Sequence, residues 1–220
     1  YKRQDLGTKI LMPLANIIPL GPMGISLLSL ITALTAGYSF YVGDLDSNKS
    51  YLLLGSLMVF LTAVFDALDG IVARKRNLSS KRGDLVDHTL DRVADIIIVG
   101  GVALGPLVDI TVGFSAIIGI LMLSYMGTQA QSVGLGRLYG GFSRADRLVV
   151  TLAGLLWAAW QAGSSGTGVD ISSLHEYAHW ALLGNAELNG MTLALAVSFW
   201  GGVYTFLVRF METRKQLLAN

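Results

Sequence analysis

The stretch 65-FDALDGIVARKRNLSSKRGDLVDHTLDRVAD-95 places six carboxylates inside or beside segments whose other residues are typical of membrane-spanning helices. The six are Asp66, Asp69, Asp84, Asp87, Asp91 and Asp95. Ionisable residues in such segments are costly to keep in lipid and are functional by default. The stretch therefore predicts a helical membrane protein and indicates where its chemistry takes place.

The composition of the whole chain agrees with a membrane protein. Of its 220 residues, 53% are hydrophobic and 14% are charged, whereas soluble domains carry about 25% charged residues. The chain has no cysteine, which excludes disulfides and thiolate chemistry. We expect membrane lipids to surround the chain, and we expect no nucleic-acid partner.

Six apolar stretches approach the length of about 20 residues that a transmembrane helix needs. They are Met23–Val42, Leu52–Ala73, Asp84–Leu107, Ile110–Ser132, Leu148–Gln161 and Met191–Met211. Before them, residues 1–20 place apolar side chains at helical spacing among basic ones, a pattern typical of a helix in the membrane interface. The predicted fold is all-α and forms a single domain over residues 1–220. It has an interfacial helix at 1–20 and a six-helix transmembrane bundle at 23–212.

The distribution of basic residues predicts the orientation of this bundle. With six spans, 15 of the 16 Lys and Arg residues fall on one face, and only Lys49 falls on the other. Loops rich in Lys and Arg remain in the cytoplasm. The active-site face and both termini are therefore predicted to be cytoplasmic.

The aspartates form stripes on two neighbouring helices. Asp66 and Asp69 are one turn apart on the second predicted span, and Asp87 and Asp91 are one turn apart on the third. Antiparallel packing of these spans would bring the four carboxylates together, where a hard divalent cation would relieve their mutual repulsion. Oxygen ligands without Cys or His favour Mg²⁺, Mn²⁺ or Ca²⁺ over zinc. The expected cofactor is Mg²⁺ or Mn²⁺, in one or two sites.

Small and basic residues accompany this cluster. Gly70, Ala73 and Gly83 leave space beside the backbone, and Arg74 with the basic loop 75–82 supplies positive charge. Carboxylates, a divalent metal, glycines and arginine together are typical of a site that handles phosphoryl or pyrophosphate groups.

The spacing D66-x2-D69-G70-x2-A73-R74-x8-G83-x3-D87-x3-D91 resembles the signature of the CDP-alcohol phosphotransferase family. The resemblance implies transfer of the lipid-phosphoryl group of a CDP-linked lipid to an alcohol, with release of CMP. It also implies a homodimer. The donor lipid would be CDP-diacylglycerol or CDP-archaeol.

The resemblance also implies a role for individual residues. Asp91 would be both the general base and a metal ligand. The full set of implied metal ligands is Asp66, Asp69, Asp87 and Asp91. The residues implied to contact the CDP-lipid are Gly70, Arg74, Ser80, Ala73, Gly83 and Ser26. Asp84 and Asp95 are expected to take no part in the chemistry.

The segment that follows the fourth predicted span bears on the acceptor alcohol. Residues 143–148 read SRADRL and resemble a stretch of the branch that makes phosphatidylinositol phosphate or archaetidylinositol phosphate. Arg144 and Arg147, with Arg137, would bind the phosphate of an acceptor, inositol 1-phosphate first. Glycerol phosphate or another small alcohol is the alternative.

Two other classes of function compete with this interpretation. His175-Glu176-Tyr177-Ala178-His179 fits the zinc-protease pattern H-E-x-x-H, although it falls on the outer loop. A divalent-cation transporter could use the same aspartates. It would also need polar residues across the whole membrane, and spans two and three become apolar beyond Asp66 and Asp95.

Overall fold

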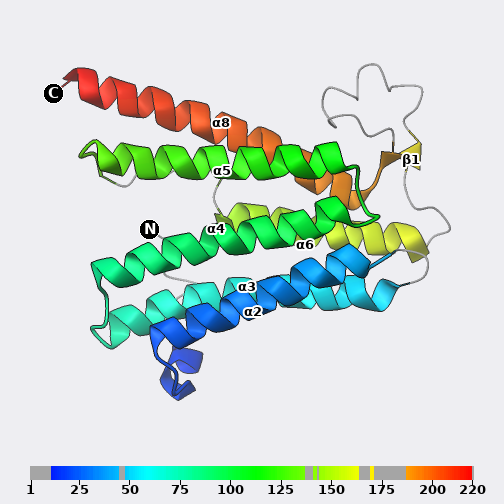
Figure 1. Cartoon of the computed structure of the whole chain (residues 1–220), viewed down its shortest axis with the longest axis horizontal. Coiled ribbons are helices and arrows are strands. Elements are labelled where there is room, and N and C mark those ends of the chain that lie inside the picture. The colour runs from blue at the N-terminus through cyan, green and yellow to red at the C-terminus, as the bar shows by residue number, and fades with distance from the viewer. Residues whose placement is uncertain are drawn as a thin grey trace.

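The computed structural model describes residues 11–44, 48–136, 141–142, 144–163, 169–170 and 187–219. Its long helices lie side by side along one axis (Figure 1). They are α2 (Pro22–Val42), α3 (Lys49–Lys75), α4 (Lys81–Leu104), α5 (Ile110–Ser132), α6 (Arg144–Gly163) and α8 (Gly190–Ala219). Residues 11–17 are also helical. The strands β1 (Val169–Asp170) and β2 (Glu187–Leu188) form one short antiparallel pair.

The six long helices coincide closely with the six predicted spans. The largest differences are at α6, which begins at Arg144 rather than Leu148, and at α8, which continues to Ala219. Helix α4 ends at Leu104 instead of Leu107 because Gly105, which is followed by Pro106, takes an extended conformation.

Four of these helices, α2, α3, α5 and α8, are long and apolar enough to cross a membrane. Helix α4 carries the charged half of the aspartate stretch, and α6 begins with Arg144, Asp146 and Arg147, which lowers the mean hydropathy of both helices. The all-helical membrane class is confirmed to this extent. The count of six spans and the interfacial position of the N-terminal segment remain predictions.

Packing orders the helices into a bundle. Helix α2 lies against α3 and α4, α5 lies between α4 and α8, and α6 contacts α3 and α8. Close approach depends on glycine at two crossings. A Cβ on Gly101 of α4 would collide with the carbonyl oxygen of Gly37 on α2. In the same way, a Cβ on Gly202 of α8 would lie only 2.6 Å from the carbonyl oxygen of Gly119 on α5. Small residues at such crossings are typical of membrane bundles.

Polar side chains inside the bundle bond across the α2–α3 contact. Ser29 Oγ donates to the carbonyl oxygen of Thr62 at 3.2 Å, and the hydroxyls of Thr32 and Thr62 lie 2.9 Å apart. These groups are buried, so their hydrogen bonds fix the register of the two helices in a low-dielectric interior.

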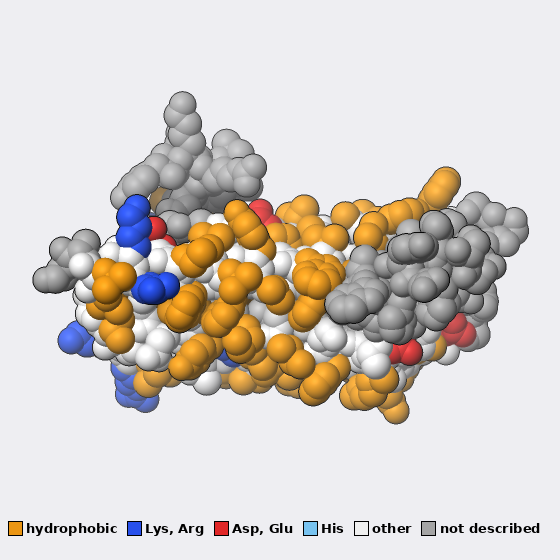
Figure 2. Space-filling model, turned by 90° about the horizontal axis from the view of Figure 1, so that it is seen from above, with side chains coloured by type: hydrophobic (Ala, Val, Ile, Leu, Met, Phe, Trp, Pro, Cys, Tyr) orange, Lys and Arg blue, Asp and Glu red, His pale blue; other side chains and the backbone are white. Residues whose placement is uncertain are grey.

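The surface of the bundle is mainly apolar along its middle. Figure 2 shows hydrophobic side chains covering the centre of one face, with most of the visible Lys and Arg side chains toward the left end. Many large apolar residues are exposed, among them Ile31, Phe60, Phe114 and Tyr204. A surface of this kind is suited to contact with lipid chains.

Candidate functional site

The turn between α3 and α4 sets the geometry of the site. Helix α3 ends in a Schellman motif, in which Leu78 N donates to Ala73 O at 2.9 Å and Asn77 N donates to Arg74 O at 3.3 Å. Asn77 has a φ of 56°, a left-handed conformation that asparagine tolerates. Ser80 then caps α4 by accepting a hydrogen bond from Gly83 N at 3.1 Å. The chain therefore reverses within a few residues.

This reversal brings the two aspartate stripes together. Asp66, Asp69, Asp87 and Asp91 line one small cavity together with Ser26, Ser29, Leu30 and Leu90, and its volume is about 10 Å³. A volume of about 10–15 Å³ on this scale holds one water molecule. The cavity is therefore the size of a single ion or water, and carboxylate and hydroxyl oxygens are the ligands that Mg²⁺ and Mn²⁺ accept.

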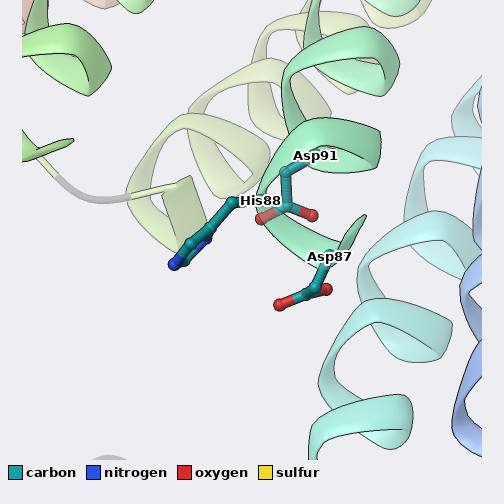
Figure 3. A group of neighbouring side chains, drawn as sticks. All are labelled: Asp87, His88 and Asp91. Carbon is teal, nitrogen blue, oxygen red and sulfur yellow. The ribbon is translucent and has the colours of Figure 1, made fainter. Parts of the chain in front are cut away.

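Asp87 and Asp91 lie next to His88. Each of the three residues offers one ligand atom, and these three atoms lie within 4.8 Å of one another. Figure 3 shows the imidazole of His88 pointing away from the two carboxylates. His88 also lies 3.7 Å from Asp84 and lines a different cavity from the one shared by the four aspartates. The described residues therefore offer two overlapping groups of candidate ligands, the four aspartates of the small cavity and the group of Asp87, His88 and Asp91.

The second cavity adjoins the first and is much larger. Its volume is about 540 Å³, within the range of small-molecule sites, about 300–1,000 Å³. All six residues predicted to contact the CDP-lipid lie in its wall: Ser26, Gly70, Ala73, Arg74, Ser80 and Gly83. Ser26 and two of the aspartates, Asp69 and Asp87, line both cavities.

The wall of the larger cavity also contains residues that the sequence analysis did not single out. They are Pro22, Met23, Leu78, Ser79, Arg82, Val86 and His88. Of these, Arg82 had a sequence signal, because it belongs to the basic loop that was expected to attract an anion. Ser79 and His88 carried none, since only the turn geometry places them in this wall.

Asp95, one turn after Asp91 on α4, forms ion pairs with two arginines. Asp95 Oδ2 lies 2.9 Å from Arg147 Nη2, and both side chains are buried. Arg92 Nη2 lies 3.4 Å from the same oxygen and 3.8 Å from Asp91 Oδ2. Asp95 therefore joins α4 to α6 structurally. Asp84 is exposed and lies in the wall of the larger cavity, and neither residue lines the four-aspartate cavity.

A third arginine, Arg209 of α8, lies close to this group. Its Nη1 donates to Leu123 O of α5 at 3.0 Å. Arg92 also donates to Ser124 Oγ. The Nε atoms of Arg92 and Arg209 are buried and have no hydrogen-bond partner among the described residues. We call Arg92, Arg147 and Arg209 the inner arginines.

The acceptor residues predicted from sequence have different outcomes. Arg147 is one of the inner arginines. Arg144 begins α6, and its side chain is outside the described part, as are Arg137 and the whole His175–His179 motif. Sequence reasoning missed Arg92 and Arg209 as candidates. Arg209 had a signal nevertheless, because it interrupts the apolar run 203–211.

Comparison with known proteins identifies similar sequences. A model of the family described as CDP-alcohol phosphatidyltransferase matches residues 14–200. The chain is 32% identical over 162 residues to an archaetidylinositol phosphate synthase of Pyrococcus horikoshii, covering 70% of this chain and 82% of that protein. It is 29% identical over 173 residues to a phosphatidylinositol phosphate synthase of Cutibacterium acnes, covering 76% and 75%.

Solved structures share the fold. The crystal structure of phosphatidylinositol phosphate synthase from Mycobacterium tuberculosis with CDP-DAG bound superposes with a TM-score of 0.65 at 20% identity, covering 95% of this chain and 94% of that one. The structure of the same enzyme with manganese and citrate gives a TM-score of 0.66, also at 20% identity, covering 94% and 88%. At this identity the likeness establishes the arrangement of helices.

Proposed function

The chain belongs to the CDP-alcohol phosphatidyltransferase family, and from this premise we propose that it serves membrane phospholipid synthesis by transferring the lipid-phosphoryl group of a CDP-lipid to inositol 1-phosphate. The observation that carries the proposal is the pair of adjoining cavities. One is ion-sized and lined by four aspartates, and the other is large enough for a nucleotide and lined by Arg74, Arg82 and Ser80.

The ion-sized cavity is suited to Mg²⁺ or Mn²⁺, held by Asp66, Asp69, Asp87 and Asp91. Bound there, a divalent cation would neutralise the negative charge of the CDP-lipid diphosphate and of the departing CMP. This proposal is supported by the four carboxylates and two serine hydroxyls in the cavity lining and by the cavity volume of about 10 Å³. The related Mycobacterium tuberculosis enzyme was crystallised with manganese.

The larger cavity is proposed to bind the donor. Gly70, Ala73 and Gly83 leave its wall open, so that a diphosphate could approach the ends of α3 and α4. Arg74 would pair with phosphate oxygens. The Ser80 hydroxyl accepts a hydrogen bond from Gly83 N, and its own proton stays available for a hydrogen bond to the CDP-lipid.

Asp91 is proposed as the general base. Its carboxylate would take the proton of the acceptor hydroxyl while that oxygen forms a bond to the lipid-side phosphorus. The bond from this phosphorus to the bridging oxygen breaks, and CMP leaves with the bonding electrons. Asp91 suits the role because it lies at the four-aspartate cavity and 3.8 Å from Arg92 of the inner arginines.

The inner arginines support an acceptor that carries a phosphate. Arg92 lies against Asp91 and Asp95, Arg147 pairs with Asp95, and Arg209 bonds to Leu123, the residue before Ser124, which is a partner of Arg92. The two buried Nε–H groups without described partners could donate to a phosphate. The names of the relatives, archaetidylinositol and phosphatidylinositol phosphate synthases, favour inositol phosphate over glycerol phosphate.

We propose that six helices cross the membrane, namely the four apolar helices α2, α3, α5 and α8 together with α4 and α6. The helical residues 11–17 would lie at the membrane interface. Helices α4 and α6 have 24 and 20 residues, enough to cross. Ile17 is 79% exposed and Leu14 is 47% exposed, as an interfacial apolar face requires. The site and both termini would face the cytoplasm, and the protein would form a homodimer.

One incubation tests this function. The purified protein is mixed with CDP-diacylglycerol or CDP-archaeol, with Mg²⁺ or Mn²⁺, and with inositol 1-phosphate, glycerol 3-phosphate, inositol or serine, and CMP is measured. We expect release that needs the metal and is fastest with inositol 1-phosphate. Faster release with inositol or serine would contradict the phosphate-bearing acceptor.

The same preparation separates the competing classes. Uptake of the metal by vesicles without CMP release from any acceptor would contradict the enzyme and support a transporter. Stoichiometric zinc, together with loss of a proteolytic activity in His175→Ala, would support the protease.

A further inference from the structure

The hydroxyl of Ser26 makes a contact that the CDP-lipid role does not explain. Ser26 Oγ lies 2.6 Å from Asp69 Oδ2, and both side chains are buried. The contact joins α2 to α3 across 43 positions of sequence. Of the polar residues of α2, Ser26 alone among those described lines both cavities. It therefore touches the carboxylate that forms part of the ion-sized cavity.

A competing explanation is that Ser26 satisfies its own helix. Ser26 Oγ also lies 3.1 Å from Pro22 O, the i−4 carbonyl that serines in transmembrane helices often use. The hydroxyl has a single proton, however, and a carboxylate is the stronger acceptor, with typical O–H···O⁻ distances of about 2.5–2.7 Å. The geometry therefore assigns the proton to Asp69.

The position of Asp69 explains why this hydrogen bond has a function. Asp69 is 6% exposed, so few waters can compensate or orient its carboxylate. Ser29 and Thr32, the next polar groups of α2, bond to Thr62 and hold the two helices in register. Ser26 continues this series to the point where α3 presents its carboxylate.

We infer that Ser26 is a positioning residue, which orients the Asp69 carboxylate as a ligand of a divalent cation by donating to its Oδ2 atom. The inference rests on the proposed metal site and revises the role that the sequence predicted for Ser26, contact with the CDP-lipid. Hydrogen-bond partners of metal ligands typically change metal affinity by about 10–100-fold when they are removed.

The test measures Mn²⁺ binding in the absence of donor and acceptor, from the electron paramagnetic resonance signal of free Mn²⁺. We expect Ser26→Ala to weaken binding by about 10-fold and Ser26→Thr, which keeps a hydroxyl, to stay within about 3-fold of wild type. The matched control is Thr32→Val, which removes another buried α2–α3 hydroxyl but lines neither cavity. It should bind Mn²⁺ like wild type.

A double-mutant cycle separates positioning from packing. In an Asp69→Asn background, where the ligand itself is altered, Ser26→Ala should cause no further loss of Mn²⁺ affinity. Unchanged affinity in Ser26→Ala would overturn the inference, and so would equal losses in Ser26→Ala and Ser26→Thr or a further loss in the Asp69→Asn background. Failure of the wild type to bind Mn²⁺ would instead overturn the proposed metal site.

Steady-state kinetics distinguish the two roles of Ser26. If it orients Asp69, Ser26→Ala raises the Mn²⁺ concentration needed for half-maximal CMP release, and saturating metal restores the KM for CDP-lipid. A raised KM for CDP-lipid at saturating metal, with normal Mn²⁺ binding, would instead show that Ser26 contacts the CDP-lipid, as the sequence predicted.

Discussion

Asp91 differs from the other aspartates because it lies between two sets of charges. On one side are the carboxylates of the ion-sized cavity, and on the other is Arg92, 3.8 Å away. Asp95, one turn further along α4, bonds to buried Arg147 instead. Under the proposed function, aspartates at neighbouring turns of α4 therefore have different roles, a chemical one for Asp91 and a structural one for Asp95, according to what each one contacts.

The first prediction at the residue scale concerns Asp91. Asp91→Asn should keep CDP-lipid binding and lower turnover by about 100-fold or more, because the amide cannot take the acceptor proton. Donor binding is measured by thermal shift and turnover by CMP release. Asp109→Asn makes the same charge change at the start of α5 and should leave turnover unchanged. Retained turnover in Asp91→Asn would contradict the assignment of the base.

The second prediction concerns Arg209. Arg209→Met should raise the KM for inositol 1-phosphate by about 10–100-fold, the cost of about 1.5–3 kcal/mol for a lost charge-assisted hydrogen bond. The KM for CDP-lipid should stay unchanged. Arg214→Met, on the exposed end of the same helix, is the matched control. Equal changes in both KM values would place Arg209 outside the acceptor site.

At the scale of elements, the α3–α4 turn decides whether the aspartate stripes meet. Helix α3 ends at Lys75 and α4 begins at Lys81. Arg76 reaches back from the turn and donates to Leu20 O at 2.8 Å and to Ile18 O at 2.6 Å. Lys75 also bonds to Asn16. The segment before α2 is thereby bound to the turn that carries the larger cavity.

A prediction follows for Asn77, the left-handed residue of that turn. Asn77→Gly should fold as well as wild type, whereas Asn77→Val should lose about 1–2 kcal/mol, because a β-branched residue is strained at positive φ. The loss is measured as a lower unfolding temperature in detergent. Equal unfolding temperatures for the Gly and Val variants would contradict the Schellman geometry.

Another prediction concerns Asp109, which caps α5. Its carboxylate accepts from Thr111 N at 2.7 Å and from the Thr111 hydroxyl, and these bonds lower the pKa of Asp109. Asp109→Ala should cost about 1 kcal/mol near neutral pH. Because the pKa is lower in the folded chain, this contribution is present above the ordinary pKa of about 3.9 and is lost as the pH falls through the lowered value. The difference in unfolding temperature should therefore narrow below about pH 4.

At the scale of the whole molecule, the bundle separates its apolar surface from its two cavities along its long axis. Apolar side chains cover its middle, and both cavities lie at the end where α3 turns into α4. A donor with lipid tails could lie in the bilayer while its nucleotide reaches Arg74 at this end. The position of the site therefore suits a reaction between a lipid and a water-soluble alcohol.

The proposed topology is testable because the chain contains no cysteine. Single cysteines at Lys49 and Ile110 should react with a membrane-impermeant maleimide added to intact cells or spheroplasts. Cysteines at Ser132 and Lys215 should react only after permeabilisation. Labelling of Ile110→Cys only from the inside would show that α4 does not cross, and the six-span arrangement would be wrong.

The sequence by itself determined the helices and the place of the site. Long apolar stretches can satisfy their backbone groups only as helices in lipid, so the ends of the six long helices could be placed to within about four residues, except for the C-terminal end of α8. Carboxylates at positions 66, 69, 87 and 91 recur at helical spacing, and this local periodicity is visible without a fold.

Only the tertiary structure decided which distant residues meet. The bond from Ser26 to Asp69 spans 43 positions, and that from Arg147 to Asp95 spans 52. Arg209 lies near Arg92 because α4 and α8 both pack against α5. No local pattern encodes such pairs, because they depend on how the helices cross, which is fixed by small residues such as Gly37, Gly101 and Gly202 at the contacts.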